Sequence, residues 1–176
     1  MTFTELRIPG AYAVHPEPIG DARGYFARTW CQREFSARGL VTRIEQCSLS
    51  YNERRGTLRG LHFQVAPFAE TKVVSCIAGS IYDVLVDVRR DSATYLQWHG
   101  EYLDADSRRA LYIPEGVAHG FQTITDGAVV SYMISTPYHE PSSRGLRWDD
   151  PRLNIQWPLE PVCVSARDSS FGFLQP

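Results

Sequence analysis

Two adjoining β-strand patterns in the middle of the chain constrain its fold more than any other feature. Residues 71–77 and 81–88 each have the length and apolar content of a strand, and Ala78-Gly79-Ser80 between them is typical of a tight turn. The second run also alternates, because successive side chains of a strand point to opposite faces. One face carries Tyr82, Val84, Val86 and Val88, and the other carries Ile81, Asp83, Leu85 and Asp87.

Similar short β patterns recur along the chain. Residues 111–113 end at the turn Pro114-Glu115-Gly116, and residues 128–136 form a further strand candidate. The helical signal at residues 32–38 is weak and ends at Gly39. Many short strands separated by Gly and Pro turns predict an all-β antiparallel sandwich or barrel with short peripheral helices. The chain has 176 residues and no evident linker or repeat, so we expect one domain over residues 1–176, with an irregular tail at 159–176.

The composition excludes several classes of partner. A net charge of −2 gives no overall attraction to nucleic acid or to an acidic membrane surface. No apolar run approaches the length of a membrane span. Cys31, Cys47, Cys76 and Cys163 form no C-x-x-C pair, so zinc is poorly supported. With no signal peptide visible, we expect reduced thiols and a cytoplasmic protein.

The stretch TLRGLHFQ, residues 57–64, places an arginine and a histidine in a run that otherwise suits a buried strand. Strict alternation puts Arg59 and His62 on opposite faces. Both can reach one site only if Gly60 bends the strand, since a glycine within a strand often marks a bulge or a close approach. If the strand does not bend, Arg59 serves a neighbouring site, such as one across a dimer interface. The alternative interpretation of His62 is a structural, partly buried histidine.

A second histidine lies in IPEGVAHGF, residues 113–121, where small neighbours leave access to the imidazole of His119. His62, Glu70 and His119 together suit the ligand set of a metal-binding cupin barrel. However, the position two residues after His62 is Gln64, and a neutral amide is a poor transition-metal ligand. We therefore expect neither a catalytic metal nor a cofactor.

Three further residues carry weaker signals. Lys72 is the single lysine beside 17 arginines, which is weak evidence that an amine is needed there. Tyr132 shares a face with Val130 and Ile134, so its phenol must find a hydrogen-bond partner or face a cavity. Asp168, in VSARDSS, is predicted to lie in a loop.

These pieces together resemble dTDP-4-dehydrorhamnose 3,5-epimerases and related nucleotide-sugar epimerases. The matching stretches are GDARGYF, GTLRGLHFQ, ETKVVSCIAGSIYDVLVDVR, LYIPEGVAHGF, Tyr132 to Tyr138, and WDDPRLNIQWP, in order over about residues 20–158. The resemblance implies a metal-independent, cupin-like jelly roll that forms a homodimer and serves deoxysugar and polysaccharide biosynthesis. It also implies a nucleoside-diphosphate 4-keto-6-deoxy hexose as substrate, by default dTDP-4-dehydro-6-deoxy-D-glucose. Removal of a proton beside the ketone gives an enolate, and its return on the other face inverts C3, C5 or both.

The same resemblance implies roles for individual residues. His62 would be the base, Lys72 would stabilise the enolate oxygen and Tyr132 would be the acid. Asp168 would orient His62 and stabilise its charged form. The substrate-binding residues would be Arg23, Phe26, Arg28, Gln46, Ser48, Arg59, His119 and Tyr138.

Two of these positions depart from the family pattern on the side expected to contact the nucleoside. Arg28 stands where the family usually has Glu, and Ser48 where it often has Asn. A CDP- or GDP-linked 4-keto sugar therefore stays open, as does epimerisation at C3 or C5 alone. A keto-sugar isomerase on the same scaffold is a further alternative, although Lys72, Tyr132 and Asp168 fit it less well. A non-catalytic nucleotide-sugar binding module is another, and the intact pairing of His62 with Asp168 argues against it.

Overall fold

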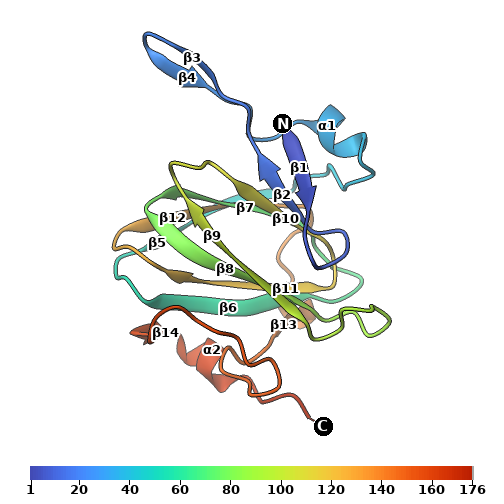
Figure 1. The fold of residues 1–176 in the computed structure, drawn as a ribbon. Helices are drawn as coiled ribbons and strands as arrows, with labels where there is room; N and C mark the ends of the chain where they lie inside the picture. The colour runs from blue at the N-terminus through green and yellow to red at the C-terminus, as the bar shows by residue number, and fades with distance from the viewer. Residues whose placement is uncertain (176) are drawn as a thin grey trace.

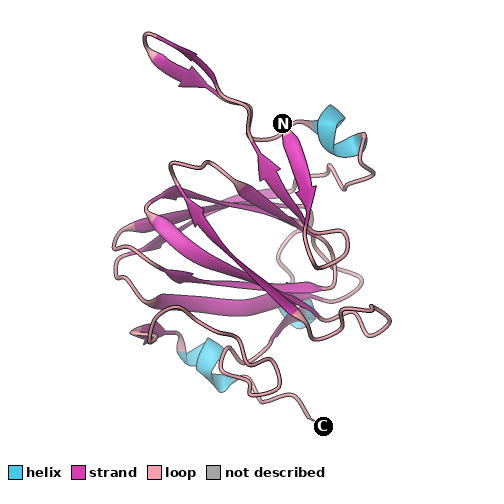
Figure 2. Ribbon diagram, viewed as in Figure 1, coloured by secondary structure: helices cyan, strands magenta, loops and turns pink. Residues whose placement is uncertain are grey.

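Two β-sheets lie face to face and enclose the main core of the protein (Figures 1 and 2). In this computed structural model, which describes residues 1–175, the first sheet has the strand order β1-β2-β10-β7-β12-β5. Its strands are β1 Thr2–Glu5, β2 Tyr12–His15, β5 Gln46–Asn52, β7 Lys72–Ala78, β10 Ala110–Ile113 and β12 Ala128–Ile134. Every neighbouring pair in it is antiparallel.

The second sheet has the order β13-β6-β11-β8-β9, with β14 paired in parallel to β6 and the other pairs antiparallel. Its strands are β6 Thr57–Gln64, β8 Ser80–Asp87, β9 Trp98–Asp104, β11 Val117–Thr123, β13 Ser143–Gly145 and β14 Cys163–Val164. The remaining elements are the hairpin β3 Ile19–Asp21 and β4 Gly24–Phe26, the helices α1 Gln32–Ser36 and α2 Ala166–Ser170, and the 3-10 turn η1 Glu140–Ser142. The predicted jelly-roll sandwich with short peripheral helices is confirmed.

Alternation along β8 divides the interior into two parts, as the sequence pattern predicts. Ile81 and Leu85 face the first sheet and are fully buried in the main core. Val84 and Val86 face the opposite side, where they pack with Leu61 beneath the C-terminal segment. Strand β8 therefore contributes side chains to two separate apolar layers, because its successive side chains point to opposite faces.

An ionic network closes the far end of β8. Asp87 is fully buried, and its carboxylate accepts hydrogen bonds from Arg89, Ser92 and Thr94 at 2.6–2.8 Å. Burial alone would disfavour the charge, but these bonds outweigh it and hold the pKa of Asp87 well below its usual value. The network ties the loop after β8 to the sheet.

The C-terminal tail is more regular than its sequence indicates, so the prediction of an irregular tail is wrong for part of it. Strand β14 pairs with β6, and α2 follows at once (Figure 1, red). Ser165 caps α2 by accepting a hydrogen bond from the backbone N–H of Asp168 at 3.0 Å. Asp168 thus lies in a helix rather than in the predicted loop. Pro176 lies outside the described residues.

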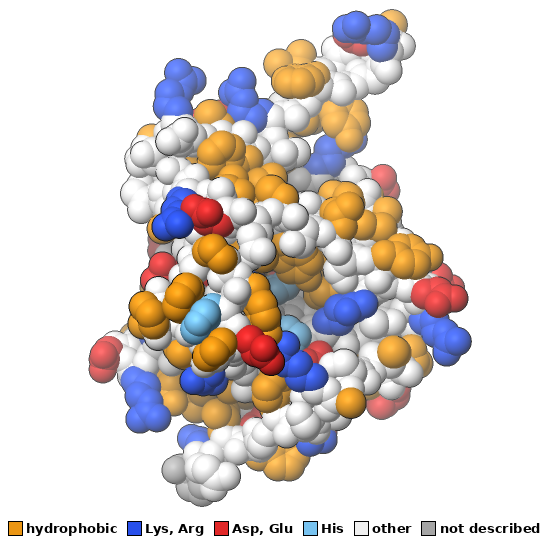
Figure 3. Space-filling view, turned by 180° about the vertical axis from the view of Figure 1, so that it is seen from behind, with side chains coloured by type: hydrophobic (Ala, Val, Ile, Leu, Met, Phe, Trp, Pro, Cys, Tyr) orange, Lys and Arg blue, Asp and Glu red, His pale blue; other side chains and the backbone are white. Residues whose placement is uncertain are grey.

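The hairpin β3–β4 extends away from the two sheets (Figure 1). Ile19 and Phe26 on it are 75% and 72% exposed. At its tip Arg23 pairs with Asp21, where basic and acidic side chains lie together in Figure 3. Among residues 1–175, no helix is long and apolar enough to cross a membrane.

Candidate active site

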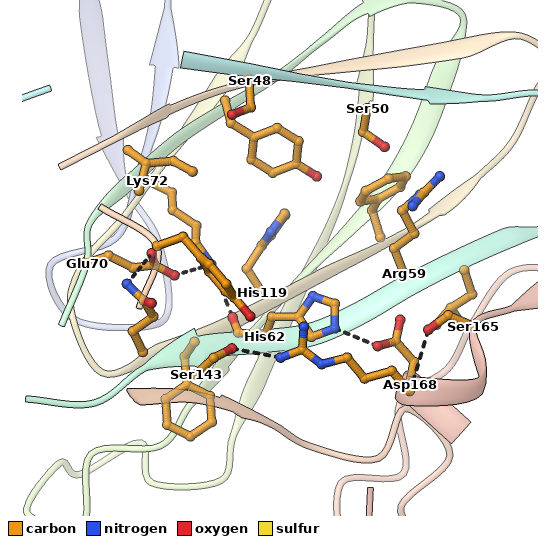
Figure 4. A pocket seen from close by; sticks show the side chains of 18 of the residues that line it. Ser48, Ser50, Arg59, His62, Glu70, Lys72, His119, Ser143, Ser165 and Asp168 are labelled. Carbon is orange, nitrogen blue, oxygen red and sulfur yellow. Dashed lines mark hydrogen bonds and ion pairs between the residues drawn. The ribbon is translucent and has the colours of Figure 1, made fainter. Parts of the chain in front are cut away.

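A cavity of about 540 Å³ opens at one end of the sandwich, between strands β5, β7 and β12 of the first sheet and β6 and β11 of the second (Figure 4). Its wall is completed by α2 and the segments beside it. Nine of the twelve predicted site residues line this cavity: Gln46, Ser48, Arg59, His62, Lys72, His119, Tyr132, Tyr138 and Asp168. The cavity therefore brings together residues that are up to 122 positions apart, from Gln46 to Asp168.

A bulge in β6 lets Arg59 and His62 face the same cavity. Opposite it on β11, His119 pairs with His62 and Phe121 pairs with Arg59, so two residues of β6 stand opposite one of β11. Gly60 sits in the bulge with φ +129°, and a Cβ there would lie 2.5 Å from the Cα of Gly120. The bend that a shared site requires is present, and it depends on glycine.

His62 and Asp168 form a hydrogen-bonded pair at the edge of the cavity. The distance from His62 Nε2 to Asp168 Oδ1 is 2.6 Å, and Asp168 Oδ2 accepts a hydrogen bond from the backbone N–H of Gly60 at 3.1 Å. Burial opposes the charge of Asp168, but the bonds from His62, Gly60 and Ser165 keep its pKa below the usual value. An ionised carboxylate is thus held against the imidazole, which is the arrangement of a general base with its orienting group.

Lys72 lies on β7 with its ammonium against a carboxylate. Its Nζ is 2.9 Å from Glu70 Oε1 and 3.2 Å from the carbonyl oxygen of His62. Gln64 donates to Glu70 Oε2 at 3.0 Å, so the amide in the supposed metal-ligand position holds a carboxylate instead. Among residues 1–175, no three His, Cys, Asp or Glu side chains are placed to hold a metal ion.

His119 is largely buried, although its side chain is part of the cavity lining. Its side chain is 4% exposed, and its Nε2 lies 2.8 Å from Oδ2 of Asp83, which is fully buried on β8. The ring of Tyr132 meets that of His119 edge to face, with centroids 5.9 Å apart. Burial, reinforced by the Asp83 carboxylate, raises the pKa of Tyr132, so this phenol keeps its proton.

The sequence interpretation missed Asp83 and Arg167 as site residues. Asp83 carried a signal, because an acidic residue on the apolar face of β8 needs a buried partner. Arg167 on α2 lines the cavity and donates to Ser143 at 2.8 Å. It adds a second guanidinium to the cavity lining, apart from that of Arg59, whose Nε donates to Asn52 at 2.7 Å.

Two predicted residues lie at the rim next to each other. Gln46 accepts a hydrogen bond from the backbone N–H of Tyr138 at 2.8 Å, and Tyr138 is 57% exposed. Ser48 is directly opposite Tyr132 in the pairing of β5 with β12. A ligand that enters past Tyr138 would therefore meet the polar side of β5 before it reaches Tyr132.

Arg23, Phe26 and Arg28 do not reach the cavity of their own chain. Arg23 and Phe26 are on the projecting hairpin, and Arg28 follows it and pairs with Glu34 at 3.4 Å. The physical reason is that Phe26 lies beside Val73 and Ser75 of β7, in a second cavity separate from the one that Lys72 lines. The role of these three as substrate-binding residues stays a prediction, since within one chain they lie apart from the other nine.

Comparisons with known proteins agree with this arrangement. The sequence model of the family described as dTDP-4-dehydrorhamnose 3,5-epimerase matches residues 5–175. The dTDP-4-dehydrorhamnose 3,5-epimerase of Methanothermobacter thermautotrophicus is 42% identical, over 96% of this chain and 92% of its own. The dTDP-4-dehydrorhamnose 3-epimerase of Streptomyces niveus is 39% identical, over 96% of this chain and 81% of its own. The crystal structure of the Bacillus anthracis 3,5-epimerase with TDP and PPi bound has a TM-score of 0.95 and 36% identity, over 98% of this chain and 99% of that one.

Proposed function

Since the chain belongs to the dTDP-4-dehydrorhamnose 3,5-epimerase family, we propose that it epimerises a nucleoside-diphosphate 4-keto-6-deoxy hexose beside the ketone. The default substrate is dTDP-4-dehydro-6-deoxy-D-glucose, inverted at C3 and C5. The observation that carries this proposal is the contact of 2.6 Å between His62 and the buried carboxylate of Asp168, in the cavity that Lys72 and Tyr132 also line.

In this mechanism His62 removes the proton beside the ketone. With Asp168 ionised, His62 Nε2 carries a proton and donates it to Oδ1, so the lone pair lies on Nδ1. No other side chain of residues 1–175 hydrogen bonds to Nδ1, which leaves this nitrogen available to the substrate. A positioned base of this kind contributes roughly 10²- to 10⁴-fold in rate.

The enolate then needs a positive charge at its oxygen and an acid on its other face. Lys72 supplies the charge, since its ammonium lies in the cavity wall opposite α2. Tyr132 supplies the proton, because its buried phenol is neutral and comes from the first sheet whereas His62 comes from the second. The two sheets thus hold base and acid on opposite sides of the cavity.

The substrate's diphosphate would lie near Arg59 and Arg167, with His119 beside the sugar. Gln46, Ser48 and Tyr138 would then face the nucleoside at the rim. The relative with TDP and PPi bound supports a nucleotide in this pocket.

A homodimer would bring the three missing residues to the site. Arg23, Phe26 and Arg28 would then reach the partner's cavity. Support comes from the exposed apolar side chains on the outer face of the first sheet, namely Leu49, Tyr51 and Ile77 at 68%, 64% and 52%. Isolated surface apolar residues are ordinary, but a group of them beside a protruding apolar hairpin marks an interface.

The organisation and location of the protein follow from the same proposal. Residues 1–176 act as one domain, because the tail supplies Ser165 and Asp168 to the cavity formed by the sandwich. The protein works in the cytoplasm, where nucleotide sugars are made. Its four cysteines are free thiols, which suits that compartment.

One alternative concerns the centre inverted and the nucleotide base. The relative named a 3-epimerase is almost as similar as the 3,5-epimerases, so inversion at one centre is the second candidate. Arg28 and Ser48 favour testing CDP- and GDP-linked sugars as well. A keto-sugar isomerase would move the carbonyl group from C4 to C3 in place of inverting a centre.

Proton NMR in deuterated water distinguishes these outcomes. The 4-keto-6-deoxy hexoses linked to dTDP, CDP, GDP and UDP are each incubated with the enzyme, and loss of the C3 and C5 proton signals is followed. Exchange at both centres of the dTDP sugar supports the default, and exchange at one supports a mono-epimerase. Absence of exchange with all four sugars would rule out the proposed reaction.

A further inference from the structure

The single lysine of the chain is held by two fixed acceptors. Lys72 Nζ contacts Glu70 Oε1 at 2.9 Å and the His62 carbonyl oxygen at 3.2 Å, and its side chain is 9% exposed (Figure 4). An ammonium has three N–H donors. One is donated to the His62 carbonyl oxygen, and Glu70 pairs with the same ammonium, which leaves donor capacity for a ligand in the cavity.

Glu70 is itself fixed in place. Its side chain is 11% exposed, and its second oxygen accepts a hydrogen bond from Gln64 Nε2 at 3.0 Å. Gln64 is 3% exposed, its Nε2 also contacts the carbonyl oxygens of Phe68 and Pro137, and its Oε1 accepts the N–H of His139. The amide is therefore locked in one orientation, and it orients the carboxylate toward Lys72.

Other acidic groups near the cavity are already engaged. Asp168 bonds His62, and Asp83 bonds His119. The titratable and charged side chains that also line the cavity are Arg59 and His62 on β6, His119 on β11, Tyr132 on β12, Tyr138 after it, Cys163 on β14, and Arg167 and Asp168 on α2. Glu70 is the one carboxylate of residues 1–175 in direct contact with the Lys72 ammonium.

We propose that Glu70, oriented by Gln64, is a positioning residue that keeps Lys72 protonated and aims its ammonium into the cavity. A buried ammonium without a counter-ion tends to lose its proton, whereas an adjacent carboxylate favours the charged form. The inference deepens the proposed function, since a protonated Lys72 is what the enolate oxygen requires. Glu70 acts through Lys72 and does not contact the reacting atoms.

The test uses the fact that one lysine gives one lysine signal. The protein is labelled with lysine carrying ¹³C at Cε, and the resonance of Lys72 is followed against pH in wild type, Glu70→Gln and a control, Glu115→Gln. Glu115 is exposed in the turn after β10 and does not line the cavity, so this variant loses the same charge elsewhere.

We expect the Glu70→Gln resonance to move to the neutral-amine position at a lower pH than that of wild type. The Glu115→Gln resonance should follow wild type, and Glu70→Asp, which retains a carboxylate, should fall between wild type and Glu70→Gln. Coincident curves for wild type and Glu70→Gln would overturn the proposal, as would an equal displacement in Glu115→Gln. If Glu70→Gln does not fold, Glu70→Asp decides by the same criterion, because its shorter side chain withdraws the charge from Nζ.

Turnover provides the second readout. In Glu70→Gln, kcat should fall by about tenfold at pH 8, less than the 10²- to 10³-fold cost of removing an electrostatic donor outright. KM should change little, and the alkaline limb of the kcat/KM profile should move to lower pH. An unchanged alkaline limb would count against the proposal. If no 4-keto sugar nucleotide is turned over, the proposed function fails, and the NMR titration still decides the role of Glu70.

Discussion

Gly60→Ala is expected to destabilise the protein and to displace the catalytic bulge. The new Cβ would lie 2.5 Å from the Cα of Gly120 and 3.0 Å from the carbonyl oxygen of His119, and both are backbone atoms that cannot rotate away. Overpacking of this kind costs about 1–3 kcal/mol. Alanine at φ +129° adds about 1–3 kcal/mol for an unfavourable backbone conformation. The free energy of unfolding should therefore fall by about 2–6 kcal/mol.

Gly24→Ala is the matched control for the backbone contribution. Gly24 has φ +126°, yet a Cβ there meets no atom within 4 Å. Gly127→Ala, in an open turn with φ +65°, controls for the location of Gly24 on the hairpin. The two controls should show only the backbone cost, so the loss in Gly60→Ala should exceed that in Gly24→Ala by about 1–3 kcal/mol.

Urea unfolding followed by tryptophan fluorescence gives the three free energies, and the exchange assay gives the activity of each variant. Gly60→Ala should lose exchange even where it is folded, because the bulge sets the positions of Arg59 and His62. A Gly60→Ala variant that loses no more stability than Gly24→Ala, or that exchanges protons at the wild-type rate, would contradict this prediction.

Three further perturbations test other parts of the account. Tyr132→Phe should reduce product formation by roughly 10²- to 10⁴-fold while deuterium still enters recovered substrate; equal slowing of both would contradict its role as the acid. Asp87→Asn should lower the free energy of unfolding at pH 7 by about 1.5–3 kcal/mol, since it removes hydrogen bonds to a buried charge. Because the pKa of Asp87 is depressed in the folded state, its contribution to the free energy of unfolding is present above the usual carboxyl range and is lost as the pH falls below about 4. The difference in stability between wild type and Asp87→Asn should therefore narrow at low pH. A difference that urea unfolding shows to be independent of pH would contradict this. When subunits of His62→Ala are mixed with subunits of the double variant Arg23→Ala/Phe26→Ala, about a quarter of wild-type proton exchange should return, because each mixed dimer contains one site free of both defects. Mixed dimers that native mass spectrometry detects but that show no activity would exclude a shared site.

The parts of the fold that sequence predicted well are those with a strong local pattern. The alternation in residues 81–88 placed Ile81 and Leu85 on the core side of β8, and the turn at Gly79 followed from its residue types. The resemblance to the epimerase family came from motifs spread over the chain and is confirmed by the match over residues 5–175. The short helix after residue 165 was missed because five residues carry too little periodicity to be distinguished from a loop.

The site was predictable in its residue types and less so in its contacts. His62, Lys72, Tyr132 and Asp168 line one cavity as the resemblance implied. The ion pair of Lys72 with Glu70 depends on side-chain directions that sequence does not give. Glu70 had been considered only as a metal ligand. The position of the hairpin residues could not be predicted, because a motif carries no information about which chain's cavity it serves.

The identity of the base tests the central claim most directly. Wild type and His62→Ala are incubated in deuterated water with dTDP-4-dehydro-6-deoxy-D-glucose, and the loss of the C3 and C5 proton signals is measured. The His62–Asp168 pair predicts that wild type exchanges these protons and that His62→Ala is slower by roughly 10²- to 10⁴-fold while remaining folded. Exchange by a folded His62→Ala at a rate near wild type would contradict the account.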